Sequence, residues 1–287
     1  MIYAIVAALP SEAKSLIEHF RLKQVIGDHP FGIWKNERIH LIVSGVGKIS
    51  SSAATAYLYK FLSRPADVWI NFGIAGHPHL PIGQPVVPIS IKDVAAEKTV
   101  YPILLTAPPC LTAPLHTVDK AEKTYRENVL YDMEGSGFFL AASKFLSLER
   151  ISLFKIVSDN LQCHFGNITK KGVQEIISQQ LPLFEKWIRS FPEDLDQKPV
   201  LNDESIFDNR RLTFSQKVKL KKIYEKILLL SQENPQEFQT KMRNLHDTEL
   251  YSFLENYLET LLRKKISGRS DFNEDRNFRN QEEDPGH

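Results

Sequence analysis

Apolar runs and polar, turn-forming residues alternate along roughly the first 190 residues of the chain. Ile2–Leu9 is continuously apolar, which is typical of a strand buried on both faces. Ser11 follows as a potential N-cap for a helix over Glu12–Phe20. The same alternation predicts strands over Arg38–Ser44, Asp67–Phe72, Pro85–Ile91 and Ile151–Ser158, and helices over Lys48–Leu62, Met133–Phe145 and Gly172–Ser190. We therefore predict an α/β fold with a central, mostly parallel (mixed) sheet flanked by helices.

Glycines and prolines mark the connections between these elements. Gly45–Gly47 and Gly73–Gly76 are predicted to form turns after the second and third strands. Residues 95–130 contain prolines at positions 102, 108, 109 and 114, so we expect this stretch to be mostly loop.

The pattern changes at residue 192. Residues 192–212 are polar and lack periodicity, and Thr213 with Gln216 then matches a capping box ahead of a helix over Lys217–Ser231. An amphipathic stripe follows in residues that recur every three or four positions: Leu250, Phe253, Leu254, Tyr257, Leu258 and Leu261. We predict a first domain over residues 1–191, a linker over 192–212, a helical extension over 213–266 and a disordered polar tail over 267–287.

Composition excludes several classes of protein. Apolar residues make up 42% of the chain and charged residues 25%, as in an ordinary globular protein, and the net charge of +1 gives no indication of nucleic-acid binding. The two cysteines, Cys110 and Cys163, are too few for a disulfide framework. The apolar run at the N-terminus is too short to cross a bilayer and lacks a basic flank, so we expect a cytoplasmic protein that does not interact with membranes.

Three of the predicted strands lead into residues that could carry chemistry. Glu12 follows the first strand, the Gly73–Gly76 segment follows the third, and Asp159 comes directly after Ile151–Ser158. Ligands of open α/β sheets bind at the carboxyl ends of the strands, so these residues are expected to lie close together. Glu134 is a further candidate, because it stands at the start of a strongly apolar helix.

Each candidate also has a purely structural interpretation. Glu12 would favour the dipole of the helix that it begins, and Asp159 would cap the turn that follows it. Glu134 would face solvent, and the glycines would only form turns. Composition and spacing leave both interpretations open.

Two other motifs do not support a cofactor or metal site. Gly45-Val46-Gly47-Lys48 lacks the Ser or Thr that follows the lysine of a phosphate-binding loop. His77-Pro78-His79 has no evident third ligand. We expect neither a metal nor a cofactor.

Taken in series, the segments resemble the purine nucleoside phosphorylase/uridine phosphorylase superfamily, and within it the methylthioadenosine/adenosylhomocysteine nucleosidases and futalosine hydrolases. The matching segments, in family order, are Ile5–Glu12, Ser44–Lys48, Asn71–Gly76 with Ile82–Gln84, Asp132–Gly135 and Val157–Asp159. They span roughly residues 1–190, whereas residues 192–287 match no family that we recognise, so the partner of the extension is unknown.

The resemblance implies a nucleoside pocket. It implies that Asp159 donates a proton towards N7 of a purine, that Glu134 holds the ribose hydroxyls and that Glu12 activates water. The other residues that it places in the substrate site are Met133, Gly73, Ile74, Ser158 and Lys155. The related enzymes are dimers or larger homo-oligomers, so we expect at least a homodimer.

Three departures from the family pattern bear on activity. Ile74 stands where the family often has Ser or Thr, and Lys155 stands where it has an arginine that can form a bidentate pair. The stretch between Asp93 and Met133 is short and lacks the segment that stacks on the base. The wall that binds the base is therefore either rebuilt, for which Leu115–Val118 is the candidate segment, or absent.

Three functions remain open at this point. The chain could be an N-glycosidic nucleoside hydrolase, a phosphorylase of the same fold, or a non-catalytic nucleoside-binding or interaction protein. Phosphorylases hold phosphate with arginines and glycine-rich turns, whereas Ala7–Lys14 contains neither residue type. The sequence therefore favours hydrolysis by water.

Overall fold

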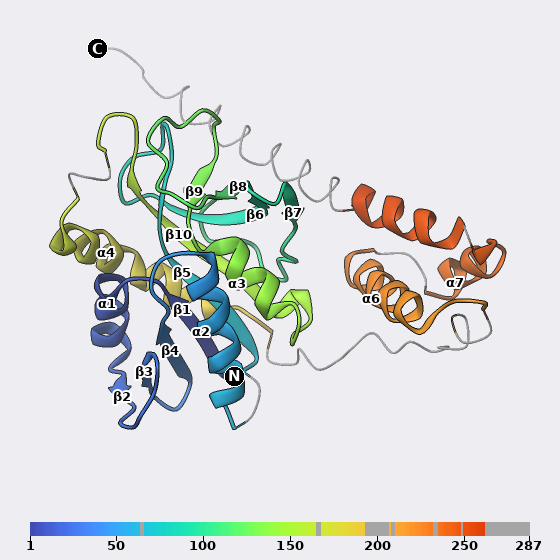
Figure 1. Cartoon of the computed structure of the whole chain (residues 1–287), viewed down its shortest axis with the longest axis horizontal. Helices are drawn as coiled ribbons and strands as arrows, with labels where there is room; N and C mark the ends of the chain where they lie inside the picture. Colours follow the sequence, from blue (N-terminus) through green and yellow to red (C-terminus); the bar gives the residue numbers. More distant parts are fainter. Residues whose placement is uncertain are drawn as a thin grey trace, which may run out of the picture. The chain divides into compact units, whose positions relative to one another are not determined.

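The chain divides into two compact units, Met1–Leu195 and Asp196–His287, which are described separately (Figure 1). The computed structural model describes residues 1–63, 66–164, 168–192, 207, 210–231, 235–247 and 249–261. The predicted tail over 267–287 lies outside the described residues, as does most of the predicted linker over 192–212. The predicted boundary at residue 191, the linker and the tail therefore stay predictions.

The first unit is built on a ten-stranded mixed sheet in the order β10-β6-β8-β9-β5-β1-β4-β3-β2, with β7 paired to β6 and a further pairing between β10 and β5. Its strands are β1 (Tyr3–Ala7), β2 (Lys23–Gln24), β3 (Gly32–Lys35), β4 (Ile39–Val43), β5 (Val68–Gly76), β6 (Pro85–Asp93), β7 (Lys98–Val100), β8 (Leu111–Thr117), β9 (Leu130–Asp132) and β10 (Ile151–Asp159). The central strands β4, β1, β5 and β10 run parallel, and antiparallel pairs lie mainly outside them. The predicted parallel core of a mixed sheet is confirmed.

Helices cover both faces of this sheet. They are α1 (Pro10–Phe20), α2 (Lys48–Phe61), α3 (Gly135–Ala142) and α4 (Lys170–Ile188), with a short 3-10 turn at Leu148–Arg150. Figure 1 shows α1 beside α4 and α2 beside α3. Side chains of β1 alternate between the two cores: Tyr3, Ile5 and Ala7 pack with the first pair of helices, and Ala4 and Val6 with the second. Both faces of β1 are therefore buried, which explains its continuous apolar run.

Two local predictions for the first unit are wrong. Ser11 is not an N-cap, because the helix begins at Pro10 and Leu9 is its N-cap. Proline suits the first helical position, since its φ angle is already helical and it has no N–H to satisfy. Gly73–Gly76 is not a turn, because β5 continues through Gly76 and pairs with β10 along its length. Tertiary strand pairing here overrides the turn tendency of glycine.

The predicted loop over residues 95–130 also contains regular structure. Two strands fall within it: β7, and β8, which pairs in parallel with β6. Pro114 is tolerated in β8 at an irregularity in the register between Pro88 and Ser90 of β6. The short hairpin of β2 and β3 was not predicted, because it lacks a long apolar run.

The second unit is helical. The capping box of Thr213 and Gln216 is confirmed, and it begins α6 (Phe214–Leu230). α7 spans Pro235–Arg243, and residues 249–261 are helical. Leu250 and Leu254 of the predicted stripe are buried in a cluster with residues of α6 and α7, and the rest of the stripe packs against it. The apolar stripe is thus covered within its own unit. Among the described residues, no helix has the length and apolar character needed to cross a bilayer.

We predict that Gly137→Ala destabilises the first unit. A Cβ atom at Gly137 would lie 2.2 Å from the backbone oxygen of Lys48, where α3 meets the start of α2. Such overpacking costs about 1–3 kcal/mol of unfolding free energy. Gly172→Ala is the matched control, since Gly172 is also the third residue of a helix but its Cβ would meet nothing closer than 3.4 Å. Urea unfolding should show a loss only for Gly137→Ala; equal stability of the two variants would contradict the close approach.

Candidate active site

A cavity of about 210 Å³ lies at the carboxyl ends of β1, β5 and β10. Six of the eight predicted site residues line it, namely Glu12, Ile74, Met133, Glu134, Ser158 and Asp159. Gly73 and Lys155 do not line the cavity; they lie directly opposite each other in the β5–β10 ladder. Parallel strands thus bring together residues that are far apart in the sequence.

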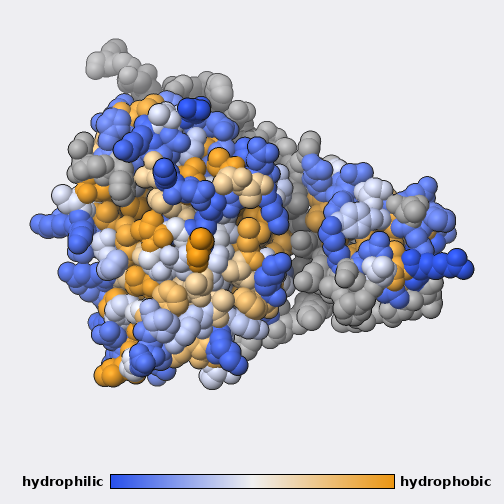
Figure 2. Space-filling model, in the orientation of Figure 1, coloured by the Kyte–Doolittle hydropathy of each residue, from blue (hydrophilic) through white to orange (hydrophobic). Residues whose placement is uncertain are grey.

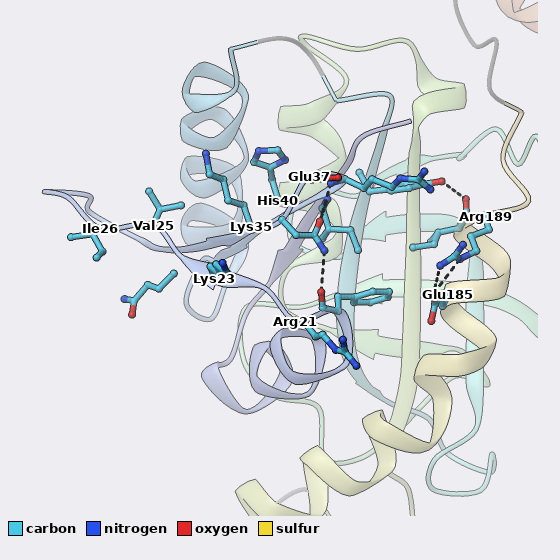
Figure 3. A pocket seen from close by; sticks show the side chains of 16 residues that line it. Arg21, Lys23, Val25, Ile26, Lys35, Glu37, His40, Glu185 and Arg189 are labelled. Atoms are coloured by element: carbon cyan, nitrogen blue, oxygen red, sulfur yellow. Dashed lines mark hydrogen bonds and ion pairs between the residues drawn. The ribbon is translucent and has the colours of Figure 1, made fainter.

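A larger, open hollow of about 1380 Å³ lies near the amino ends of the central strands (Figure 3). Residues of the β2–β3 hairpin, of the C-terminal ends of α1 and α4, and the first residues of β1 and β4 line it. None of the predicted site residues is among them. The candidate chemistry therefore belongs to the smaller cavity.

Glu12 is held by backbone N–H groups on both carboxylate oxygens. Oε2 accepts hydrogen bonds from the N–H of Ala8 (2.9 Å) and Leu9 (2.8 Å), and Oε1 accepts one from the N–H of Ile74 (2.9 Å). Burial raises the pKa of Glu12, while these N–H donors and the charge of Lys155 oppose the rise. Because Glu12 accepts a hydrogen bond from the N–H of Leu9, the N-cap residue of α1, its structural interpretation holds together with its place in the cavity.

Gly73 makes room for this carboxylate. A Cβ atom at Gly73 would lie 2.7 Å from Oε1 of Glu12, closer than real Cβ contacts allow. The glycine therefore contributes to the site by having no side chain.

Glu134 enters the cavity at the junction between β9 and α3. Its Oε1 accepts a hydrogen bond from the N–H of Gly47 (2.8 Å), whose φ of 103° suits glycine. The side chain is buried, so the solvent-exposed interpretation is wrong. Burial, followed by the neighbouring charge of Asp132, raises the pKa of Glu134 to about 7. Its carboxylate therefore gains or loses its charge close to neutral pH.

Lys155 lies beneath the cavity and neutralises part of its negative charge. Its Nζ is 2.7 Å from Oδ2 of Asp132, and the lysine is 1% exposed. Asp132 also accepts hydrogen bonds from Thr117 Oγ1 (2.7 Å) and from the N–H of Gly135 (2.8 Å). Burial alone would lower the pKa of Lys155, but Asp132, Glu134 and Glu12 together raise it. The lysine is thus placed to support the carboxylates and does not face the cavity.

Asp159 presents a carboxyl group at the end of β10. Ser158 Oγ donates a hydrogen bond to Oδ1, and the hydroxyl of Tyr125 donates one to Oδ2. The turn that follows is capped instead by Asn160, whose Oδ1 accepts from the N–H of Gln162 and Cys163, both at 2.9 Å. Asp159 is therefore not needed as a turn cap.

The wall beside Asp159 differs from the one predicted. Of Leu115–Val118, only Val118 lines the cavity, because Leu115–Thr117 belongs to the buried end of β8. Tyr125 and Tyr131 complete the wall and were missed. A signal for Tyr125 was present, since it is the single aromatic residue of the polar segment 119–129.

The described residues contain no group of three His, Cys, Asp or Glu side chains placed to hold a metal ion. His77 uses its Nδ1 as an acceptor for the backbone N–H of His79 (3.1 Å) and Leu80 (3.0 Å). This histidine therefore stabilises a turn.

No family model and no curated protein sequence matches the chain, but solved structures share its fold. The 5′-methylthioadenosine nucleosidase of Arabidopsis thaliana aligns with 65% of this chain and 94% of its own, at a TM-score of 0.55 and 18% identity. The 5′-methylthioadenosine/S-adenosylhomocysteine (MTA/SAH) nucleosidase of S. pneumoniae aligns with 66% of this chain and 99% of its own, at a TM-score of 0.51 and 19% identity. The corresponding nucleosidase of Chlamydia trachomatis aligns with 67% of this chain and 100% of its own, at a TM-score of 0.52 and 22% identity. The chain therefore has the predicted nucleoside phosphorylase fold, in the form found in MTA/SAH nucleosidases.

Proposed function

We propose that this chain is a nucleosidase that cleaves the N-glycosidic bond of a purine-type nucleoside by attack of water. The observation that carries the proposal is the convergence of Glu12, Glu134 and Asp159 on one small cavity, each with different partners. Carboxyl groups in different environments can take different roles in one reaction. The named activity of the proteins that share the fold is in agreement.

Asp159 is the proposed acid for the leaving base. The C–N bond breaks with its electron pair moving to the base, and a proton from the carboxyl group neutralises the charge that develops there. Asp159 is buried at the cavity wall beside Val118 and Tyr125, which could contact an aromatic base. Such proton transfer contributes about 10²–10⁴-fold to a rate.

Glu134 is the proposed ribose-binding group. A carboxylate accepts hydrogen bonds from sugar hydroxyls and also stabilises the positive charge that develops on the sugar as the bond breaks. The N–H of Gly47 fixes one of its oxygens and leaves the other for a ligand. Met133, the preceding residue, also lines the cavity.

Glu12 is the proposed base for water. Three backbone N–H groups hold its carboxylate in one orientation, which favours accepting a proton from a positioned water. Among the described residues that line the cavity, none is Lys, Arg or His. A phosphate dianion would therefore meet carboxylates without a facing cation, which favours water over phosphate as the nucleophile.

We also propose that the protein is a cytoplasmic homodimer. Val46 lines the cavity and is 50% exposed, and Ile49, at the start of α2, is 87% exposed. Figure 2 shows apolar residues gathered on the face of the first unit that carries the start of α2. A second copy that covers these residues would also close the mouth of the cavity.

Sedimentation should give twice the 32.9 kDa chain mass at micromolar concentration, because two chains are expected to associate; a stable monomer would contradict the dimer.

We predict that Asp159→Asn lowers kcat by about 100-fold or more, because the amide cannot supply the proton. Nucleoside binding should be largely kept, since the side chain keeps its shape. Chromatography of the base and sugar released from a panel of purine nucleosides measures the effect. Asp28→Asn makes the same change at an exposed position and should behave as wild type. A wild-type protein that binds a nucleoside but releases no base would overturn the enzyme proposal and favour a binding protein.

We predict that Glu12→Gln lowers hydrolysis by a similar factor, about 10²-fold, because the amide cannot accept a proton from water. The amide NH₂ would also face a backbone N–H donor, so the folded fraction should be measured by thermal unfolding. Glu18→Gln, on the exposed face of the same helix, is the control. The assay should be run with and without phosphate. Ribose 1-phosphate formed at an undiminished rate by Glu12→Gln would show phosphorolysis and refute the hydrolase.

A further inference from the structure

Both oxygens of Asp159 are engaged by hydroxyl groups, and one of these comes from a residue without an assigned role. Ser158, the neighbour in sequence, donates to Oδ1, and Tyr125, which is 34 positions away, donates to Oδ2. One such hydrogen bond leaves the carboxyl group free to rotate about its Cβ–Cγ bond. Two donors on opposite oxygens fix its plane.

The backbone at Tyr125 is held in an unfavourable conformation. Its φ is +46°, in the left-handed region that residues other than glycine seldom adopt. Such residues persist where the surrounding structure enforces them, and they cluster at functional sites.

Gly76 provides the space for this contact. A Cβ atom at position 76 would lie 2.7 Å from the hydroxyl oxygen of Tyr125 and 2.8 Å from Oδ2 of Asp159. Glycine within a strand often marks a close approach of another group. The end of β5 is therefore shaped for the Tyr125–Asp159 pair.

A small apolar cluster anchors the tyrosine ring. Tyr125, Val129 and Tyr131 are buried together, with Val118 packed against them. The rings of Tyr125 and Tyr131 meet edge to face, with centroids 5.7 Å apart at 72°. The ring is thus fixed in place although the segment that carries it is largely polar.

We propose that Tyr125 is a positioning residue that orients Asp159 towards the leaving base; this inference rests on the proposed nucleosidase function. Asp159 gives its proton to the base nitrogen as the C–N bond breaks, and Tyr125 keeps its own proton throughout. The phenol O–H then donates to the carboxylate that forms on Asp159. Because a donor to a charged oxygen binds more strongly than a donor to a neutral one, the contact stabilises the transition state more than the bound substrate.

The test is Tyr125→Phe, which removes the hydroxyl and keeps the ring. We expect kcat to fall by about 10- to 100-fold while KM changes by about twofold or less, because the contact strengthens only as charge develops. Tyr57→Phe is the matched control, since it also loses a bonded hydroxyl, 2.9 Å from Nδ1 of His29 and away from the cavity. In an Asp159→Asn background, Tyr125→Phe should cause little further loss.

Gly76→Ala provides a second route to the same contact. The added methyl group crowds both the hydroxyl of Tyr125 and Oδ2 of Asp159 while both residues stay in the chain, so kcat should fall by at least a similar factor. Near-UV circular dichroism checks that each variant is folded. Full kcat in either folded variant, or an equal loss from Tyr125→Phe with and without the Asp159 carboxyl group, overturns the role of Tyr125. Absence of base release by the wild-type protein is a different result, because it overturns the nucleosidase function itself.

Discussion

The buried ion pair between Lys155 and Asp132 is the interaction on which the site depends. Removing two charges from water costs on the order of several kcal/mol per ion, so such a pair persists only with further hydrogen bonds. Asp132 has them from Thr117 and Gly135. The ammonium group also interacts with the charges of Glu134 and Glu12. Without it, burial would favour the neutral forms of Glu134 and Glu12.

The register of the central strands makes this arrangement possible. Lys155 lies opposite Gly73 in the β5–β10 ladder, and the space left by the glycine is filled by the carboxylate of Glu12. Towards the carboxyl ends of the same strands, Asp159 pairs with Gly76 and meets Tyr125 there. Each glycine of β5 therefore admits a side chain from another element. This also explains why a segment with the composition of a turn is a strand.

The local pattern predicts five of the ten strands, among them the parallel centre of the sheet, and three of the carboxylates, because these depend on short-range features. Ile2–Leu9 is apolar since both of its faces are buried, and Glu12 and Asp159 follow strand ends directly. The contacts between segments were not predictable in the same way. Tyr125 reaches Asp159 through an unusual backbone angle in a polar segment, and no periodicity indicates that. The position of Lys155 beneath the cavity likewise depends on Asp132, whose three partners come from separate elements.

The structural and catalytic interpretations of Glu12 do not compete. Its carboxylate joins the end of β1 and the start of α1 to β5 through the N–H groups of Ala8, Leu9 and Ile74. A base for water must keep one orientation while its proton affinity stays high, and burial supplies the affinity while the backbone supplies the orientation. Ile74 brings no hydroxyl to the cavity, so its backbone N–H is the polar group that it offers there. The carboxylate that links β1 and α1 to β5 is therefore also suited to the proposed role of preparing water for attack.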